Sequence, residues 1–271
     1  MKIVCDLGFG ACDFRQAMYY YIFDIKRCKK RATIEAIKNV LLELGISGEY
    51  NYISNAQPAE KLVDLGLSRG YSTIVGVGSD DLINSVVNRM IGRKEAMGVI
   101  PLEVSKPMST LLGVDFWKDA CEALRFRRIK EMYVGRTANG EHFLTEAHID
   151  SGKPVDLTIE FKDYIVQVLA KNFMISNYYP GIKKIGADYL DVIIESQPVV
   201  SSSFLNQFKS IFSPKITNNG SRSMSVIRAR SMRVFTKKPV SIISGEKMIA
   251  KTPQLVESSD EMLRLIVSRK H

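Results

Sequence analysis

The sequence predicts an α/β domain with a parallel sheet, followed by an antiparallel β domain. The first observation is an alternation of strand-like and helix-like segments up to about residue 126. The second is a buried-strand pattern at Thr73–Val77 that runs through a tight turn into a helical pattern, as in a βαβ unit. The third is a succession of strand-like segments after Arg127. We therefore expect an α/β domain over residues 18–126 and a β domain over residues 127–253.

The elements before the central strand follow from local patterns. Tyr19–Phe23 is rich in aromatic residues, which favours a strand. Ala32–Leu44 places its apolar residues on one helical face and is followed by glycine, a common helix stop. Tyr50–Ser54 is the next expected strand. Pro58–Arg69 is the next expected helix, because proline is favoured in the first turn.

The central unit continues in the same style. A helix is expected over Leu82–Met90, and a second buried strand over Gly98–Leu102. A loop and a helix follow within Glu103–Gly113, and Phe116–Phe126 is one more short helix. Parallel strands alternating with helices are the expected result.

The second half is expected to be mostly β. An Asn139-Gly140 pair predicts a hairpin turn, flanked by strands at Ile129–Val134 and His142–Ala147. Ser201–Phe212 is either a helix or an excursion, and Glu257–Val267 returns to the first domain as a helix or a strand. A loop is expected at Pro214–Arg222, and further strands at Val155–Glu160, Tyr164–Ser176, Tyr189–Glu195, Val226–Thr236 and Val240–Ile243.

Composition is that of a soluble globular protein, with 45% hydrophobic and 25% charged residues in 271. No apolar run approaches the roughly 20 residues that span a bilayer, and no signal peptide is evident, so a cytoplasmic protein is expected. Residues 1–17 are interpreted as a tail or an over-extended reading frame, with Met18 as the natural start. Four cysteines without metal-binding spacing are expected to be free thiols: Cys5, Cys12, Cys28 and Cys121.

The formal net charge of +9 favours an anionic partner such as a nucleotide, an acidic membrane surface or nucleic acid, although solubility alone also explains it. Arg228 and Arg230 alternate on an expected strand and so share a face. That face suits anionic lipid or RNA, or is simply solvated, and the scarcity of interleaved aromatics weakens the RNA interpretation. The whole basic run comprises Arg222, Arg228, Arg230, Arg233, Lys237 and Lys238.

The central stretch resembles the catalytic domain of diacylglycerol kinases and related bacterial lipid kinases. Gly78–Asn88, GSDDLINSVVN, aligns without gaps with the motif G-G-D-G-T-x-N-E-V-V-N of that family. Pro101–Gly113 aligns with P-L-G-T-G-N-D-(aliphatic)-A-R-x-L-G. Weaker similarity extends over Tyr19–Val267, including the hairpin at Tyr133–Leu144 and Ser244–Glu246 at a D-G-E motif.

The resemblance implies a lipid kinase/NAD kinase-like architecture. That architecture is a Rossmann-like parallel α/β domain followed by an antiparallel β-sandwich, with residues 254–271 packing back on the first domain. It implies ATP and Mg²⁺ as cofactors, a lipid hydroxyl as acceptor, and allows a homodimer.

The phosphate-binding turn of the family corresponds to Gly78–Leu82. The resemblance assigns nucleotide contacts to Gly78, Ser79, Asp80, Asp81 and Leu82. Here Asp81 replaces a glycine, and its repulsion of one phosphate charge 4 Å away is about 4 kcal/mol at an effective dielectric of 20. ATP should therefore bind poorly unless Asp80 and Asp81 hold a bridging Mg²⁺. The structural alternative is that Ser79 or Asp80 caps the following helix.

The other two functional motifs have also changed. In the second loop, Ser105 and Lys106 occupy positions that contact nucleotide in the family, but Pro107 indicates a helix start capped by Ser105. The general base of the family falls on Ser244, and serine alone is no general base. Glu246 is the substitute base, acting with Asp80, unless the segment is only a turn between strands.

Three hypotheses follow. The chain is an active ATP-dependent lipid kinase, a kinase-fold protein that binds or regulates without catalysis, or a basic binder of nucleic acid or membrane surfaces. The losses at three sites favour weak or absent catalysis. Elsewhere, His142, His148 and His271 lack metal spacing, and His142 and His148 are interpreted as surface residues.

Overall fold

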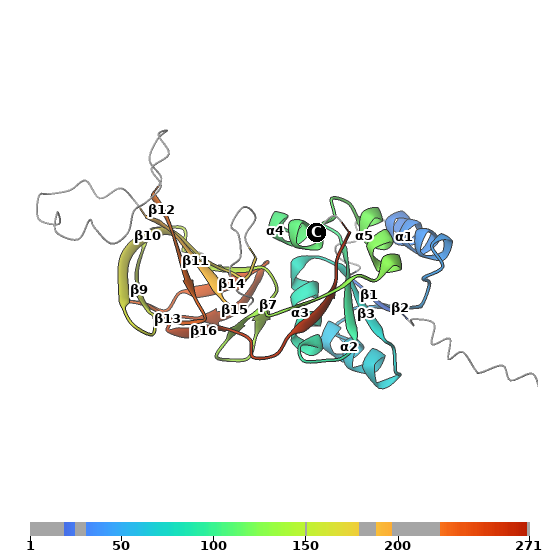
Figure 1. The fold of residues 1–271 in the computed structure, drawn as a ribbon, viewed down its shortest axis with the longest axis horizontal. Helices are drawn as coiled ribbons and strands as arrows, with labels where there is room; N and C mark the ends of the chain where they lie inside the picture. Colours follow the sequence, from blue (N-terminus) through green and yellow to red (C-terminus); the bar gives the residue numbers. More distant parts are fainter. Residues whose placement is uncertain (1–18, 25–30, 150, 179–187, 197–222, 270–271) are drawn as a thin grey trace, which may run out of the picture.

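The computed structural model describes residues 19–24, 31–149, 151–178, 188–196 and 223–269. Two lobes lie side by side (Figure 1). The α/β lobe is built on a six-stranded sheet, called sheet A, and the β lobe on an eleven-stranded sheet, called sheet B. No helix among the described residues is long and apolar enough to cross a membrane.

Sheet A has the strand order β2-β1-β3-β4-β17-β5, and every neighbouring pair is parallel except β17 with β5. Because β17 follows all of sheet B in the chain, the C-terminal segment crosses back between the lobes, seen in dark red in Figure 1. The strands are β1 (Tyr19–Phe23), β2 (Glu49–Tyr52), β3 (Thr73–Gly78), β4 (Ala96–Pro101), β5 (Ile129–Met132) and β17 (Leu263–Ile266).

Helices cover both faces of sheet A (Figure 1). α2 packs on α3, and α1 packs on α5. The helices are α1 (Arg31–Glu43), α2 (Ala59–Ser68), α3 (Asp80–Met90), α4 (Lys106–Leu112) and α5 (Trp117–Phe126). The five helices predicted from apolar periodicity are thus present, each within a few residues of the expected bounds.

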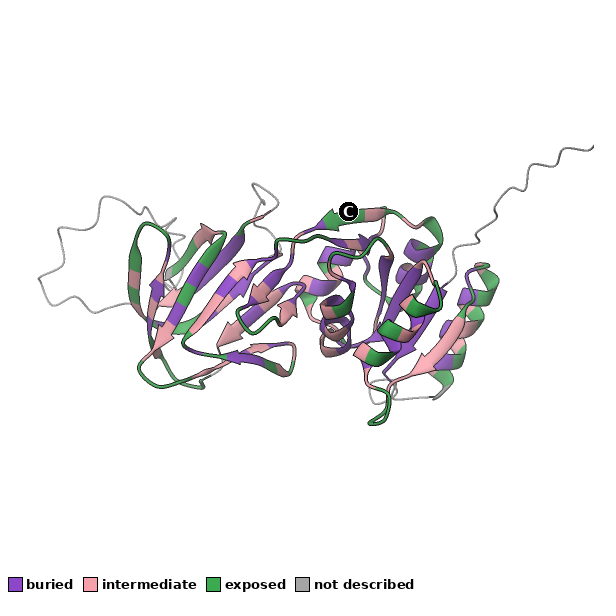
Figure 2. Cartoon of the chain, turned by 90° about the horizontal axis from the view of Figure 1, so that it is seen from below, coloured by how far each residue is buried: buried purple, intermediate pink, exposed green. Residues whose placement is uncertain are grey.

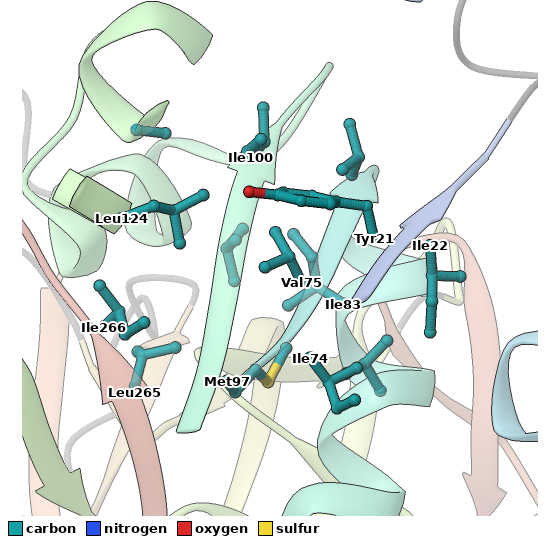
Figure 3. Close-up of a cluster of buried hydrophobic side chains, with 14 of the residues drawn as sticks. Tyr21, Ile22, Ile74, Val75, Ile83, Met97, Ile100, Leu124, Leu265 and Ile266 are labelled. Carbon is teal, nitrogen blue, oxygen red and sulfur yellow. The ribbon is translucent and has the colours of Figure 1, made fainter. Parts of the chain in front are cut away.

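The core of this lobe is centred on the inner strands of sheet A. β1 is buried along its whole length, as expected for a parallel strand covered on both faces. Two of its three tyrosines are accommodated because their hydroxyls find backbone partners: Tyr21 donates to the Ile46 carbonyl at 2.6 Å and Tyr19 to the Leu124 carbonyl at 3.0 Å. The buried Tyr20 hydroxyl has no hydrogen-bond partner. Figure 3 shows Tyr21 among apolar side chains from sheet A and the helices.

Sheet B is antiparallel and follows the order β15-β14-β8-β10-β9-β13-β16-β6-β7, with β11 pairing β10 and β12. Figure 2 shows buried and exposed positions alternating along these strands, the pattern of strands with one face on a core. The strands are β6 (Gly135–Thr137), β7 (His142–Phe143), β8 (Glu146–Ile149), β9 (Val155–Glu160), β10 (Ile165–Ser176), β11 (Leu190–Ser196), β12 (Ser223–Ala229), β13 (Ser231–Thr236), β14 (Ser241–Ser244), β15 (Lys247–Lys251) and β16 (Gln254–Ser258).

Three strand predictions were wrong in detail. Ile129–Met132 joins sheet A beside β17, and the partner of β7 in the hairpin is Gly135–Thr137. The predicted strand His142–Ala147 is broken at Leu144, because the Leu144 amide donates to Asn84 of α3 instead of to a strand. Val226–Thr236 is two strands separated at Arg230. For Glu257–Val267 the alternatives were a helix or a strand, and β16 and β17 are strands.

Some predictions fall outside the described residues. These are the tail at residues 1–17 with its boundary at Met18, the segments Ser201–Phe212 and Pro214–Arg222, and His271. Of the cysteines, only Cys121 is described, and it is buried with a free thiol.

Candidate functional site

A cleft of about 220 Å³ lies where the two lobes meet, and we call it the acidic cleft. The α/β lobe contributes the start of α3 and the loop before α4, and the β lobe contributes β8 and the β14–β15 turn. Five sequence-predicted residues come together here: Ser79, Asp80, Asp81, Ser105 and Glu246. The remaining lining residues are Glu103, Thr145, Glu146, His148, Ser244 and Gly245.

A second cleft of about 390 Å³ opens beside it, at the ends of β1 and β2, and we call it the strand-end cleft. Ser79, Asp81 and Leu82 line it, together with the acids Asp24 and Glu60. Its other lining residues are Ile53, Ser54, Asn55, Pro58, Ala59 and Ser85. The predicted Lys106 lines neither cleft and is exposed at the first position of α4.

Gly78 packs closely against Leu82 and Asp24 at the start of the turn. A β-carbon there would lie 2.8 Å from the Leu82 side chain and 3.0 Å from the Asp24 β-carbon, so close packing requires glycine. This is a packing role and not a contact with the clefts.

Asp80 is held by the second loop. Its Oδ2 accepts a hydrogen bond from the Ser105 amide at 3.1 Å, while its Oδ1 is buried with no partner. Burial raises the pKa of Asp80; the Ser105 hydrogen bonds act in the opposite direction, and the charge of Asp81 adds to the rise. When Asp80 is ionised, its Oδ1 is therefore buried without a hydrogen-bond donor or cation to stabilise the charge.

The predicted capping of α3 by Ser79 or Asp80 was wrong. Ser79 occupies the N-cap position with extended backbone, but its side chain makes no capping bond and its Oγ is buried without a partner. Asp80 instead reaches across to Ser105. The prediction for the second loop was right: Ser105 caps α4 by accepting from the Met108 amide at 3.4 Å, and Pro107 lies in the first turn.

Asp81 links the two lobes. Its Oδ1 accepts the amide of Glu246 at 2.9 Å and the amide of Lys247 at 3.2 Å. Gly245, with φ of +64°, gives the β14–β15 turn its close approach to this carboxylate. The acid that replaces a family glycine is thus engaged with protein amides, which limits its availability to a metal.

The expected position of the general base is also engaged. Ser244 is buried, donates through Oγ to the Glu146 carbonyl at 2.7 Å and accepts from Asn84 Nδ2 at 3.0 Å. Glu246 is exposed at the rim of the acidic cleft. The segment Ser244–Glu246 forms the β14–β15 turn, which was one of its two predicted roles.

Glu146 and His148 are lining residues that the sequence analysis missed. They alternate with the buried Ala147 on β8, so both face the acidic cleft, and this spacing of two was the available signal. Burial, and then the charge of Asp80, raise the pKa of Glu146, and its Oε2 is buried without a partner. The interpretation of His148 as a surface residue was wrong.

His142 was also misassigned to the surface. Its amide donates to Asn88 Oδ1 at 2.7 Å, and its Nδ1 lies 3.0 Å from the same oxygen. Burial lowers the pKa of His142. Asn88 Nδ2 also donates to Glu141 at 3.0 Å, so this residue, like Asn84, ties α3 to the β lobe.

The second loop retains the backbone of a glycine at Glu103. This residue has φ of +61°, in the left-handed region that favours glycine. The motif that this loop resembles has glycine at this position, which agrees with the left-handed backbone of Glu103. Glu103 adds a further carboxylate to the acidic cleft.

Arg228, Arg230 and Arg233 of the basic run line a third cleft, of about 850 Å³ in the β lobe, which we call the arginine cleft. Arg228 is paired with the buried Asp191 at 2.8 Å, and Arg230 lies 3.8 Å from Asp188 and 3.5 Å from Asp260. Nearby acids thus offset much of the predicted basic face. Phe161, Tyr164 and Tyr189, which lie next to the ends of other strands, line the same cleft as these arginines.

A scan against protein-family models finds no match, and a search of curated proteins finds none either. Solved structures match over nearly the whole chain. A diacylglycerol kinase from Bacillus anthracis str. Sterne superposes with a TM-score of 0.69 at 17% identity, covering 93% of this chain and 97% of that chain. The chain has the diacylglycerol kinase fold.

Two further structures from the same organism superpose with TM-scores of 0.71 and 0.72 at 16% identity, again over 93% of this chain, covering 97% and 98% of theirs. At such identities the likeness establishes the diacylglycerol kinase fold and leaves activity open. The resemblance seen in the sequence is confirmed at that level. Within this fold, the acidic cleft is lined by residues from all three segments that the sequence resemblance singled out, namely Asp80, Ser105 and Ser244.

Proposed function

We propose that this chain is a kinase-fold protein without phosphoryl-transfer activity, which acts as a binding module through its interlobe clefts. One observation carries the proposal. The acidic and strand-end clefts together are lined by seven carboxylates and, among the described residues, by no lysine or arginine. The seven are Asp24, Glu60, Asp80, Asp81, Glu103, Glu146 and Glu246.

Electrostatics argue against a bound triphosphate. Each carboxylate 4 Å from a phosphate charge costs about 4 kcal/mol at an effective dielectric of 20. Phosphoryl transfer depends on positive charge and positioned donors around the phosphates. The described walls supply the opposite charge, so they do not fit ATP.

Residues at the motif positions form hydrogen bonds between the two lobes. Asp81 binds two amides of the β14–β15 turn, and Ser244 is saturated by Asn84 and the Glu146 carbonyl. Asp80 and Glu246, proposed in the sequence as the acid–base pair, both line the acidic cleft, but Glu246 is exposed. These contacts support a binding function over catalysis.

The fold also suggests a domain division, a location and a class of ligand for this chain. We infer a Rossmann-like first domain that runs from β1 to α5 and is completed by β5 and β17, and a β-sandwich built from β6 to β16. We infer a cytoplasmic location as well. A lipid remains the candidate ligand class suggested by structures of this fold.

The test combines binding and turnover. Thermal shift with Mg·ATP should show no stabilisation, whereas saturation at 100 times Kd would add about 2.7 kcal/mol. No phosphate should be transferred from labelled ATP to diacylglycerol vesicles. The matched variant is Asp81→Gly, which removes one carboxylate and restores the family glycine; it should bind nucleotide more tightly than the wild type. Phosphorylated lipid formed by the wild type, and lost in Asp80→Asn, would overturn the proposal.

A second candidate function is binding of an anionic ligand in the arginine cleft. The observation in its favour is that Phe161 and Tyr164 stack at 4.9 Å beside Arg228 and Arg230. Aromatic faces with arginines suit single-stranded nucleic acid, and such binding weakens steeply with salt. An RNA oligonucleotide should bind with salt dependence and lose affinity in Arg233→Gln. Binding to anionic vesicles instead would favour a membrane surface, and binding to neither would remove this candidate.

A further inference from the structure

We propose that the acidic cleft binds a divalent cation between Asp80 and Glu146, with the Ser79 hydroxyl as a third oxygen. Asp81, the ligand expected from the sequence, takes no part. The site goes beyond the proposed function, because it requires neither nucleotide nor lipid.

Three oxygen atoms on the walls of this cleft lack partners. They are Asp80 Oδ1, Glu146 Oε2 and Ser79 Oγ, each buried and without a hydrogen bond. Buried polar atoms in folded proteins nearly always have a partner, and an exception points to a water, an ion or a proton. Two of the three belong to carboxylates, which when ionised only accept. The missing partner is therefore positively charged or a donor.

The unpartnered hydroxyl of Ser79 supports a cation site independently of the two carboxylates. Its exposed fraction is 6%, and the two clefts meet at this residue. A serine at a helix N-cap ordinarily uses its hydroxyl to satisfy the helix, but this one does not. A neutral hydroxyl left unpaired on the wall of the same cleft is not explained by charge repulsion among acids. It is explained by a cation that all three oxygens coordinate.

The ligand set follows from the hydrogen bonds. Asp81 is left out of the ligand set because its Oδ1 already accepts two amides of the opposite lobe and neither of its oxygens is among the buried atoms without a partner. Asp80 is oriented by the Ser105 amide on Oδ2, which leaves Oδ1 directed elsewhere. Such outer hydrogen bonds commonly fix a metal-binding carboxylate. Glu146 comes from the other lobe, so the cation would bridge the two.

The chemistry of these donors favours a hard cation. Mg²⁺ is typically bound by one or two carboxylates and keeps several waters, and Mn²⁺ substitutes in oxygen sites. Among the described residues no three His, Cys, Asp or Glu side chains group as a metal cluster, so the proposed site has only two carboxylates and depends on the Ser79 hydroxyl and water for its other ligands. Two carboxylates, one hydroxyl and water match the Mg²⁺ type.

The test is Mn²⁺ titration of the nucleotide-free full chain, followed by electron paramagnetic resonance, with Mg²⁺ as competitor. One Mn²⁺ should bind per chain, and Glu146→Gln and Asp80→Asn should each weaken binding at least about tenfold, as for loss of a metal ligand or its support. Ser79→Ala should weaken it less. Thermal unfolding of each variant without metal shows whether it is folded.

Glu246→Gln is the matched control, because it removes one charge from the same cleft at an exposed position. It should leave Mn²⁺ affinity within about twofold of the wild type, a free-energy difference of roughly 0.4 kcal/mol by RT ln 2. Equal losses in Glu246→Gln and Glu146→Gln would overturn the site in favour of diffuse attraction. Absence of Mn²⁺ binding in the wild type would overturn it in favour of a proton shared by Asp80 and Glu146. Neither result bears on phosphoryl transfer, which is assayed separately.

Discussion

Replacement of Gly245 by alanine tests whether Asp81 serves as a link between the lobes. Gly245 has φ of +64°, and a β-carbon there would lie far inside van der Waals contact of Asp81 Oδ1. Alanine in the left-handed region costs about 1–2 kcal/mol. A gain of about 0.4–1 kcal/mol from the stiffer unfolded chain offsets part of that cost. The backbone effect alone is therefore about 1 kcal/mol.

The contact with Asp81 adds a second loss. Hydrogen bonds to a charged acceptor contribute about 1.5–3 kcal/mol each, and two amides donate to Asp81. Because Asp81 is partly exposed, water replaces some of this, and we take about 1 kcal/mol for each bond. Gly245→Ala should then lower the free energy of unfolding by about 3 kcal/mol.

Gly140 provides the control, since it has φ of +85° and open space where a β-carbon would go. Gly140→Ala should cost only the backbone effect of about 1 kcal/mol. Urea unfolding of both variants, followed by circular dichroism, gives the comparison. In an Asp81→Gly background the cost of Gly245→Ala should fall to that of the control. Equal costs for the two glycines in the wild-type background would refute the role assigned to Asp81.

Three further predictions concern the same interface. Asn84→Ala leaves the Leu144 amide and Ser244 without their partner, and should cost about 2–3 kcal/mol in urea unfolding. Glu146 has a raised pKa, so below the ordinary glutamate pKa of about 4.3 its carboxyl is neutral in both the folded and the unfolded chain. As pH rises through the raised pKa, the cost of burying the ionised carboxylate lowers the free energy of unfolding. Glu146→Gln should therefore stabilise the metal-free protein near pH 8 but not near pH 4. His142 has a lowered pKa, so stability should fall as pH drops below about 6.5, and His142→Gln should flatten that fall.

Each of these has an outcome that contradicts it. Asn84→Ala with a loss under about 0.5 kcal/mol, typical of surface substitutions, would mean that water replaces both bonds. A pH-independent effect of Glu146→Gln would show that its carboxyl is not desolvated. An undiminished loss of stability below about pH 6.5 in His142→Gln would show that His142 is not its source. Asp163→Asn, at an exposed turn, is the control for general charge effects in both pH series.

Much of the fold could be predicted because it depends on short patterns. The buried run of β1 and the apolar face of α1 specify their elements without reference to distant residues. Predictions failed where a distant side chain decided the outcome. Asn84 takes the Leu144 amide and so ends a strand that the local sequence would continue. A period-two pattern cannot reveal such a competitor for the backbone hydrogen bond.

The sequence predicted which residues line the acidic cleft better than it predicted what their side chains bind. Motif alignment placed Asp80, Asp81 and Glu246 in one cleft, and they do line it. The alignment could not show that the Asp81 carboxylate accepts hydrogen bonds from two backbone amides, because those amides are 165 and 166 residues away in the chain. Glu146 was missed because nothing in its own motif marks it; only the fold brings β8 against α3.

The polar face of α3 connects these observations. Asp81, Asn84 and Asn88 are spaced three and four residues apart, so they lie on one side of the helix. All three bond to the β lobe, while the opposite face is buried in the α/β lobe. A family glycine exchanged for Asp81 extends this row by one turn toward the acidic cleft. Under the proposed function, the carboxylate of Asp81 has two effects: its charge opposes a bound phosphate, and its hydrogen bonds to Glu246 and Lys247 hold one lobe on the other.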